Sequence, residues 1–409
     1  MLAVARSALQ RRSRNTSRAA LIAAAMLAFS GSSFPGLPAL AQSSSPTLAQ
    51  SSADSSLAQL SAEADAARRT GNTTRAAELY TQAVSLNPSW PDGWWYLGQM
   101  NYSVNNYKAA IDAFTHYLTL VPNAAPATAL RGLCEFELAD YPSSLRDVQR
   151  ALALGAADDS RNTQILRYHQ GLLLTKLGRY EQALDSYRWF ARQHLSSQDL
   201  MVAVGLAALR LPLLPQEADA ARTAMSADAG NAVFLLLSGD NSAAAQAFAA
   251  FFERYPATPN VHYTWGYLLY PTDPDAAISR FQQELSTDPA NAIDRSMLAW
   301  ALLMDNSPAE ALPEAKKAAE EAPTLPMAQL SLGRALLETG DAKTATQVLE
   351  KALPLDPQNL EIHLALARAY SETGREQDAR RERLACLAMT EPSSKPAPAM
   401  GQQGAPPAN

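Results

Sequence analysis

Cysteine is almost absent from this chain, and so are clusters of metal-binding side chains. Only two cysteines occur in 409 residues, and aromatic residues make up 7% of the sequence. Cys134 and Cys386 both lie in apolar stretches, so we expect them to be small buried residues rather than a disulfide pair. The five histidines include no pair three to five residues apart, the spacing that places two zinc ligands on one helix face.

The sequence also lacks the short motifs that indicate nucleotide, nucleophile or redox chemistry. It contains no phosphate-binding loop, no Gly-x-Ser-x-Gly turn and no Cys-x-x-Cys pair. It therefore predicts a protein that is not an enzyme and that uses no metal or cofactor. A catalytic site in 198–224 is the alternative, and a metal or cofactor bound tightly to the purified protein would favour it.

Acidic residues are missing from residues 1–41, which carry five arginines. A basic start, an apolar run over 19–29 and small residues two positions apart ending at Ala41 are typical of a cleavable export signal. The apolar run is too short to span a bilayer. We expect cleavage after Ala41 and a periplasmic or secreted protein, with the general and twin-arginine export routes both open.

Excess basic charge and long apolar runs are missing from the rest of the chain. Without the five N-terminal arginines, 29 of the 34 basic residues remain against 40 acidic ones, and the net charge falls from −6 to −11. Because nucleic-acid binding depends largely on neutralising phosphates, no nucleic-acid partner is expected. No later segment is long and apolar enough to span a membrane, so we expect no membrane insertion after signal cleavage.

What the chain has in quantity is internal repetition with a period of 34 residues. Residues 326–359 align with 57–90, so that Gly340 falls on Gly71 and Pro357 on Pro88. Each block holds two amphipathic stretches that are separated by a glycine turn and ended by a proline. Such a period predicts an all-α solenoid, in which stacked helix pairs extend a surface rather than enclose a pocket.

Ten units of varying quality follow one another, and the pattern is weakest in the middle. Pro212 and Pro215 interrupt the turn expected within 198–224, where the solenoid is expected to bend or split into two lobes. A further unit is expected at 225–257. The expected organisation is a signal peptide at 1–41, a disordered Ser-rich linker at 42–56, a first array at 57–197, degenerate helical repeats at 198–257, a second array at 258–390 and a disordered Pro/Ala-rich tail at 391–409.

The ends of the helices carry local signals. Gly178, Gly340 and Gly374 come where a first helix should end in a left-handed residue. Ser307, followed by a proline and then by Glu310, predicts a capping box at a helix start. The prolines expected to stop second helices are Pro122, Pro289, Pro323 and Pro357.

These repeats closely resemble the tetratricopeptide repeat family. Its characteristic residues appear in register in the second unit as Trp94, Leu97, Gly98, Ala110, Phe114 and Pro122, and in the ninth as Leu332, Gly333, Gly340, Ala345, Ala352 and Pro357. Asn101 and Tyr117 depart from the family pattern. The resemblance implies a right-handed superhelix of antiparallel helix pairs, with first helices lining a concave groove. It also implies a protein–protein scaffold without a catalytic site.

The resemblance further indicates which first-helix positions face the groove. The partner-binding candidates at those positions are Trp95, Gln99, Tyr102, Tyr168, Tyr263, Tyr267, Trp300, Arg334 and Arg368. Tyr and Trp bury a large area and are favoured at binding hot spots, but the alternative is that the rings pack within the solenoid. For the two arginines the alternative is surface pairing with Glu338 and Glu361. The Lys and Asn pair with which some members grip a C-terminal carboxylate is missing.

We therefore expect an exported bacterial adaptor that binds a protein or an extended peptide in its groove. The alternative is a structural subunit of a cell-envelope secretion or biogenesis complex, which makes contacts through the convex face or the termini. Recovery of the chain in a defined stoichiometric complex would favour that alternative. Self-association stays open under both hypotheses.

Overall fold

The computed structural model of the protein describes residues 48–155 and 161–390, with side chains from residue 55 onwards. These residues contain 19 α-helices, one short 3₁₀ turn and no strand, which confirms the predicted all-α solenoid. The chain forms two compact units, one ending at Arg254 and one beginning at Tyr255. The predicted signal peptide and C-terminal tail lie outside the described residues.

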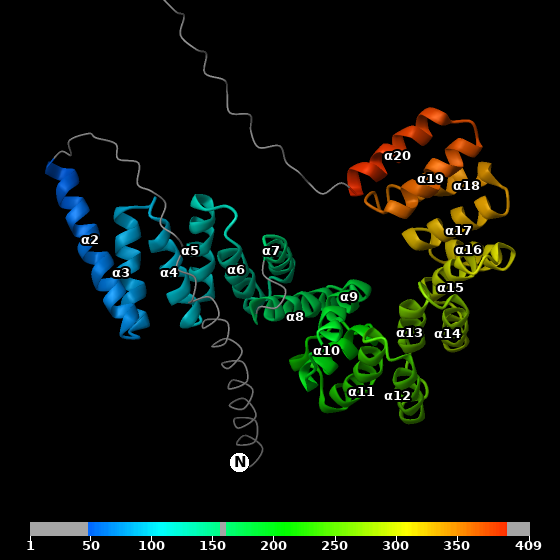
Figure 1. The fold of residues 1–409 in the computed structure, drawn as a ribbon, viewed down its shortest axis with the longest axis horizontal. Helices are drawn as coiled ribbons and strands as arrows, with labels where there is room; N and C mark the ends of the chain where they lie inside the picture. The colour runs from blue at the N-terminus through cyan, green and yellow to red at the C-terminus, as the bar shows by residue number, and fades with distance from the viewer. Residues whose placement is uncertain (1–47, 156–160, 391–409) are drawn as a thin grey trace, which may run out of the picture. The chain divides into compact units, whose positions relative to one another are not determined.

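The first unit is a row of helices in which each one packs on the next in sequence (Figure 1). The helices are α2 (Leu48–Arg69), α3 (Thr73–Leu86), α4 (Pro91–Ser103), α5 (Tyr107–Leu120), α6 (Ala125–Glu137), α7 (Tyr141–Ala153), α8 (Arg161–Lys176), α9 (Tyr180–Arg192), α10 (Gln198–Ala208), the 3₁₀ turn η1 (Pro215–Glu217), α11 (Ala220–Leu237) and α12 (Asn241–Arg254). The pairs α2–α3, α4–α5, α6–α7 and α8–α9 correspond to the four units expected over 57–197.

A left-handed residue turns the chain between the two helices of each pair. It recurs every 34 residues as Gly71, Asn105 and Ala139, whose φ angles are 75°, 60° and 61°. Gly178 shows the same conformation at 75°, as the sequence predicts. Only glycine adopts this conformation without a steric cost from Cβ, so Ala139 is strained by about 1 kcal/mol. Two turn hydrogen bonds hold it there, from the Ala139 and Asp140 amides to the carbonyls of Phe136 and Glu135.

The N-terminal boundary of the fold differs from the prediction. The Ser-rich linker was expected to extend to residue 56, but α2 begins at Leu48. Residues 48–56 contain neither proline nor glycine, and a helix that is already nucleated extends at little cost through such a sequence. The last helix of the chain ends at Thr390, where the prediction places the end of the second array.

The weak middle of the chain also differs from the prediction. Units were expected at 198–224 and 225–257, but α11 runs through that boundary, from Ala220 to Leu237. The two expected helix pairs are therefore three helices, α10, α11 and α12. The division between the compact units falls after Arg254, so 198–224 belongs wholly to the first unit rather than separating two lobes.

Two glycines allow α10 and α11 to cross in close contact. A Cβ on Gly205 would lie 2.8 Å from the Cα of Ser226 and closer still to its carbonyl. A Cβ on Gly230 would lie 2.8 Å from the amide nitrogen of Gly205 and would meet the backbone of Met201. Real Cβ atoms do not approach other atoms so closely, so both positions require glycine at this crossing.

The second unit repeats the helix-pair pattern. Its helices are α13 (Val261–Leu269), α14 (Pro274–Thr287), α15 (Ala292–Met304), α16 (Pro308–Glu321), α17 (Pro326–Glu338), α18 (Ala342–Ala352), α19 (Leu360–Glu372) and α20 (Glu376–Thr390). Gly340 and Gly374 are left-handed, with φ of 86° and 77°, as expected. The prolines predicted to stop second helices follow the ends of α5, α14, α16 and α18, which confirms that reading.

The predicted capping box at Ser307 is not formed. Ser307 is the N-cap residue of α16, but its side chain accepts no hydrogen bond from the helix. Its hydroxyl instead donates to the carboxylate of Asp305, 3.2 Å away, which turns it from the first turn of the helix.

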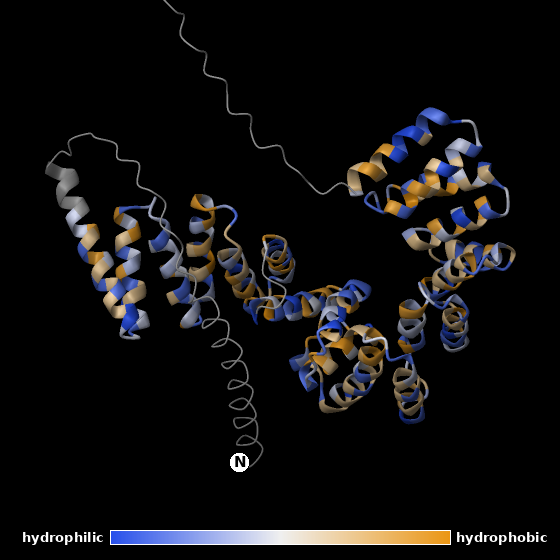
Figure 2. Ribbon diagram, viewed as in Figure 1, coloured by the Kyte–Doolittle hydropathy of each residue, from blue (hydrophilic) through white to orange (hydrophobic). Residues whose placement is uncertain are grey.

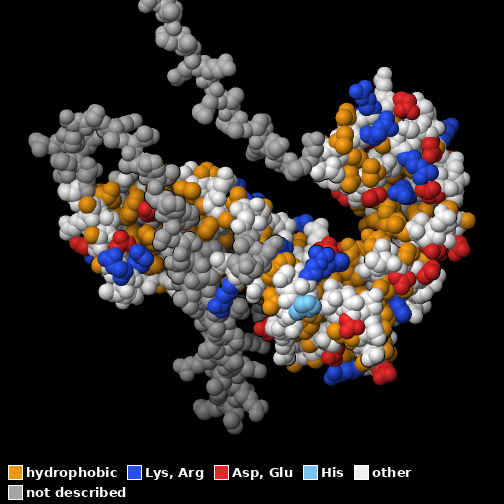
Figure 3. Space-filling view, in the orientation of Figure 1, with side chains coloured by type: hydrophobic (Ala, Val, Ile, Leu, Met, Phe, Trp, Pro, Cys, Tyr) orange, Lys and Arg blue, Asp and Glu red, His pale blue; other side chains and the backbone are white. Residues whose placement is uncertain are grey.

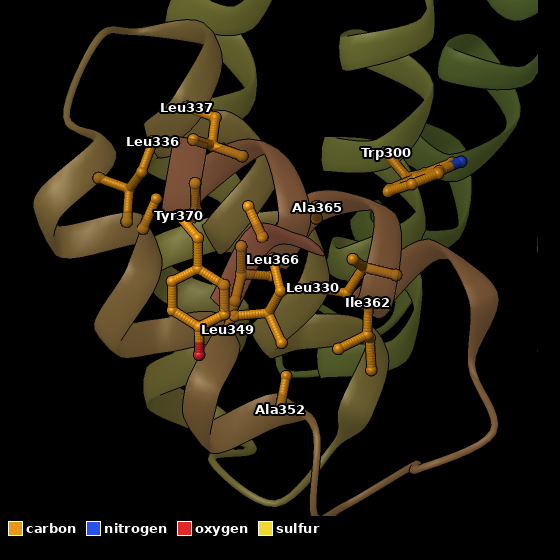
Figure 4. Close-up of a cluster of buried hydrophobic side chains, with 13 residues drawn as sticks. Trp300, Leu330, Leu336, Leu337, Leu349, Ala352, Ile362, Ala365, Leu366 and Tyr370 are labelled. Atoms are coloured by element: carbon orange, nitrogen blue, oxygen red, sulfur yellow. The ribbon is translucent and has the colours of Figure 1, made fainter. Parts of the chain in front are cut away.

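Apolar stripes along the helices build a continuous core within each unit. Figure 2 shows hydrophobic and hydrophilic residues sharing the same helices in both units. In the second unit, Leu330, Leu349 and Leu366 pack with Tyr370 and Trp300 in one cluster (Figure 4). Cys134 and Cys386 are both buried and free, so the prediction of small buried side chains is confirmed.

Candidate partner-binding surface

Two candidate residues of the first unit share one face of α4. Trp95 is half-buried, with its ring centroid 5.8 Å from that of Phe114 and 5.5 Å from that of Tyr117. Gln99 follows four residues later and is partly exposed as well. Residues four apart on a helix lie above one another, so these side chains form one surface strip. Packing orients the Trp95 ring and leaves part of it accessible.

The other two candidates of the first unit differ in exposure. Tyr168 on α8 is partly exposed, although burial of its hydroxyl raises its pKa above the usual range. Tyr102 on α4 is only 4% exposed and belongs to the core cluster formed by α4, α5 and α6. Its side chain therefore packs within the solenoid, and it offers almost no surface to a partner.

The aromatic candidates of the second unit are mostly packed as well. Tyr263 is 4% exposed and Trp300 is 9% exposed, and both contact core side chains. The Tyr263 ring lies 5.9 Å from that of Phe281 and stacks on Tyr267 at 6.3 Å. Trp300 extends toward the cluster around Ile362 in Figure 4. Tyr267 keeps partial exposure and is the accessible member of this group.

Arg334 and Arg368 are paired with carboxylates rather than free. Arg368 donates to Glu338 at 2.6 Å and to Glu372 at 2.8 Å. Arg334 lies 3.4 Å from Glu361 and 3.9 Å from Glu338. The hydrogen bond from Arg368 lowers the pKa of Glu338. Figure 3 shows basic and acidic side chains interspersed over the C-terminal helices, in agreement with surface pairing. The role of both arginines in binding stays a prediction.

A recurring side-chain hydrogen bond links neighbouring helix pairs, and sequence reasoning missed it. Trp94 donates from its indole nitrogen to the carbonyl of Pro88 at 2.8 Å. The same contact recurs at 34-residue spacing in the second unit, with Arg295 to Pro289, Gln329 to Pro323 and His363 to Pro357. The prolines were read only as helix stops, and Trp94 only as a packing residue. A donor six residues after each proline was the available signal.

One buried acid was also missed. Glu135 on α6 is 8% exposed, and its Oε2 accepts no hydrogen bond from the described residues. Burial, with the nearby charge of Asp147 as a second cause, raises the pKa of Glu135 to about 7. Glu135 lies 34 residues after Asn101, a position at which the family pattern has an aromatic residue. A carboxylate at a position expected to be buried was a visible sequence signal.

The described part of the chain contains no group of three or more His, Cys, Asp or Glu side chains placed to hold a metal ion. Within the same residues, no helix has both the length and the apolar character needed to cross a membrane. The surface in hand is therefore a row of helix faces with aromatic and polar side chains, whose chemistry is that of non-covalent contact.

Comparison with protein families identifies the repeat. Models described as Tetratricopeptide repeat match residues 61–125, 168–232 and 267–326, and a second model of the same description matches 336–382. No curated protein matches the sequence.

Solved structures share the repeat architecture. MamA from Desulfovibrio magneticus RS-1, from residue 41 to its end, is 19% identical, with 40% of this chain and 94% of that one covered and a TM-score of 0.36. A tetratricopeptide repeat protein from Parabacteroides merdae is 16% identical, with 77% and 99% covered and a TM-score of 0.30. Yeast Tom70 is 14% identical, with 83% and 93% covered and a TM-score of 0.30. Such values give no basis for transferring a partner from these proteins.

Proposed function

Because the chain belongs to the tetratricopeptide repeat family, we propose that it is a non-catalytic scaffold that binds a protein partner along its first helices. The observation that carries this proposal is the strip formed by Trp95 and Gln99 on α4. Packing on Phe114 and Tyr117 orients the indole, while part of the ring stays accessible. An oriented aromatic side chain loses little conformational entropy on binding, which is why such residues dominate binding hot spots.

Tyr168 on α8 and Tyr267 on α13 extend the proposed contact to both units, each unit contributing its own partly exposed aromatic ring. Tyr102, Tyr263 and Trp300 support these surfaces from beneath, because their side chains are buried. Arg334 and Arg368 would contribute only by exchanging their carboxylate partners for those of a ligand, which costs the existing pairs. The proposed partner is a protein or an extended peptide.

We further propose that the scaffold acts outside the cytoplasm, after removal of residues 1–41. The support for this lies in the sequence alone: a basic start, a short apolar run and small residues ending at Ala41. Sequencing of the N-terminus of the protein recovered from the periplasm or medium tests this part. A chain that begins at Gln42 supports export, and an intact start in the cytoplasm overturns it.

The binding proposal is tested by crosslinking and capture from envelope fractions with the purified protein as bait. The test variant is Trp95→Ala/Tyr168→Ala, which truncates two partly exposed rings on first helices. The matched control is Leu86→Ala/Leu120→Ala, which truncates two exposed side chains at the ends of second helices, with exposures of 51% and 38%. Both variants are first checked for unchanged helicity by circular dichroism.

We expect the test variant to lose a specific partner at least tenfold while the control retains it, because truncated hot-spot residues typically cost more than about 1 kcal/mol each. Retention of the partner by the test variant and its loss from the control would place recognition on the second helices and overturn the proposal. Recovery of a fixed stoichiometric complex that neither variant disturbs would favour a structural subunit instead.

A further inference from the structure

The third helix pair departs from the recurring proline contact. Thr128 lies 34 residues after Trp94 and 6 residues after Pro122, where the other pairs place a large side chain with an N–H donor. The Thr128 hydroxyl instead donates to Ala124 of its own helix, at 3.0 Å. Arg150 on α7 supplies the missing donor, from Nη2 to the Pro122 carbonyl at 2.9 Å. The carbonyl is therefore satisfied, but the space of the large side chain is not filled.

A surface recess of about 300 Å³ lies at this place, between α5, α6 and α7. Its lining residues are Thr115, Leu118, Thr119, Pro122, Thr128, Arg131 and Arg150. Each has a counterpart 34 residues earlier, around the Trp94 ring. There the indole stacks on His116, with ring centroids 4.3 Å apart. The recess is thus the same inter-repeat position as that of Trp94, with its own side chain removed.

The lining of the recess has also changed its charge. Leu97 and His116, beside the Trp94 ring, correspond to Arg131 and Arg150 in the recess. The Arg131 guanidinium binds Asp147 through two hydrogen bonds, of 2.6 and 3.1 Å, which raise the pKa of Arg131 and fix its orientation. Asp147 is buried, with a side chain 2% exposed, and neutralises Arg131 alone.

Arg150 supplies the net charge of the recess. Its side chain is exposed and, among the described residues, pairs with no carboxylate. Its contact with the Pro122 carbonyl occupies one of five N–H donors, so a planar face of the guanidinium remains for a ligand. Thr115 and Thr119, one turn apart on α5, place hydroxyl groups along the same recess.

We propose that this recess binds the carboxylate side chain of a Glu or Asp in the protein partner. Charge complementarity selects this occupant, because the recess is positive in a chain that is otherwise acidic, and guanidinium groups bind carboxylates in a planar, charge-assisted geometry. The inference rests on the proposed role as a protein-binding scaffold. It adds a second contact on the second-helix side, separate from Trp95 and Gln99.

Disulfide tethering on the purified protein tests the chemistry of the recess without a known partner. Thr119→Cys places an exposed thiol at its rim. Ser85→Cys is the matched control, because Ser85 is exposed and lies 34 residues earlier, beside the recess that Trp94 fills. The probes are mixed disulfides of 3-mercaptopropionic acid, of its amide and of 2-phenylethanethiol. The readout is the concentration of 2-mercaptoethanol that releases half of each probe, measured by mass spectrometry. Both native cysteines are buried and give little background.

We expect T119C to hold the acid about threefold to tenfold more strongly than the amide, the range of an exposed but oriented ion pair. S85C should show no such preference. Arg150→Gln should abolish it by removing the charge. Thr128→Gln should abolish it by filling the recess, as Gln329 fills the equivalent position in the second unit.

Equal retention of acid and amide by T119C would overturn the proposal, as would a preference that survives R150Q. Strongest retention of the phenyl probe would show instead an aromatic-binding recess, like the one that Trp94 occupies. The outcome does not depend on the groove variants. Failure here therefore leaves the scaffold function standing, and failure of partner capture with W95A/Y168A leaves the tethering result standing.

Discussion

The close crossing of α10 and α11 makes Gly205→Ala the sharpest test of the fold. In a helix, this substitution by itself favours folding by about 1 kcal/mol, because Ala has the higher helix propensity. At Gly205 the new Cβ meets the backbone of Ser226, 2.8 Å from its Cα and closer to its carbonyl. Backbone cannot turn aside as a flexible side chain does, so the two helices have to separate.

The separation determines the size of the effect. It loosens contacts across a face that includes Val202, Leu206 and Val233, all less than 5% exposed. A gap of even 0.5–1 Å forfeits about a quarter to a half of each dispersion contact. Overpacking typically costs about 1–3 kcal/mol, and here it acts on backbone at both helices. We therefore expect a net loss of about 3 kcal/mol and a fall in Tm of roughly 6–12 °C for a unit of this size.

Gly132→Ala is the matched control, in the middle of α6 of the same unit. Its Cβ would lie 3.1 Å from the Cβ of Asp147 and 3.3 Å from the carbonyl of Ser144, so small shifts accommodate it. We expect it to change stability by less than about 1 kcal/mol, because helix propensity offsets the crowding. Thermal melts followed by circular dichroism compare the variants, and amide exchange locates the weakened helices, since repeat stacks need not unfold in one step. Equal melting temperatures for both variants would refute the reasoning.

Three further predictions follow from single residues. Ala139→Gly should stabilise the first unit by about 1 kcal/mol in urea unfolding, because it removes Cβ strain at φ 61°; a loss of stability would contradict the strain argument. Glu135→Gln should stabilise the protein increasingly as pH rises from about 4.5 to 7, by up to about 3 kcal/mol, because the folded pKa is raised and wild-type stability falls across that window. Melts at pH 4.5 and pH 8 measure this, and a pH-independent difference would count against it. Trp94→Phe should cost about 1 kcal/mol or more by leaving the Pro88 carbonyl without its donor, and an unchanged midpoint of unfolding would show that water replaces the bond.

The sequence predicted local structure well where each signal acts within one helix pair. Glycine at 178, 340 and 374 ends a first helix in a left-handed residue, and the structure has positive φ at all three. Ala139 and Arg210 adopt the same conformation at 61° and 53° without being glycine, because the turn hydrogen bonds and the following helix impose it. Such positions were predictable from the period but not from residue type.

The predictions that failed depended on contacts between helices. The boundary expected at 224 lies inside α11, because the Gly205–Gly230 crossing joins α10 and α11 in a way that a 34-residue template does not describe. The exposure of the candidate binding residues was equally out of reach. Trp95 and Tyr102 both occupy family groove positions on α4, yet Tyr102 is 4% exposed while Trp95 keeps an accessible edge. That difference is set by which side of α4 the neighbouring helix covers.

The sequence alone determined the repeat, its helical character and the ends of most helices, because these depend on hydrophobic periodicity and on residues that are close in the chain. The tertiary structure decided which side chains remain accessible and which donors reach the proline carbonyls. It also decided that the place of Trp94 is vacant one repeat later and flanked by Arg131 and Arg150. These features depend on how a helix packs against residues one whole repeat away, and a single period does not specify the fit of two different repeats.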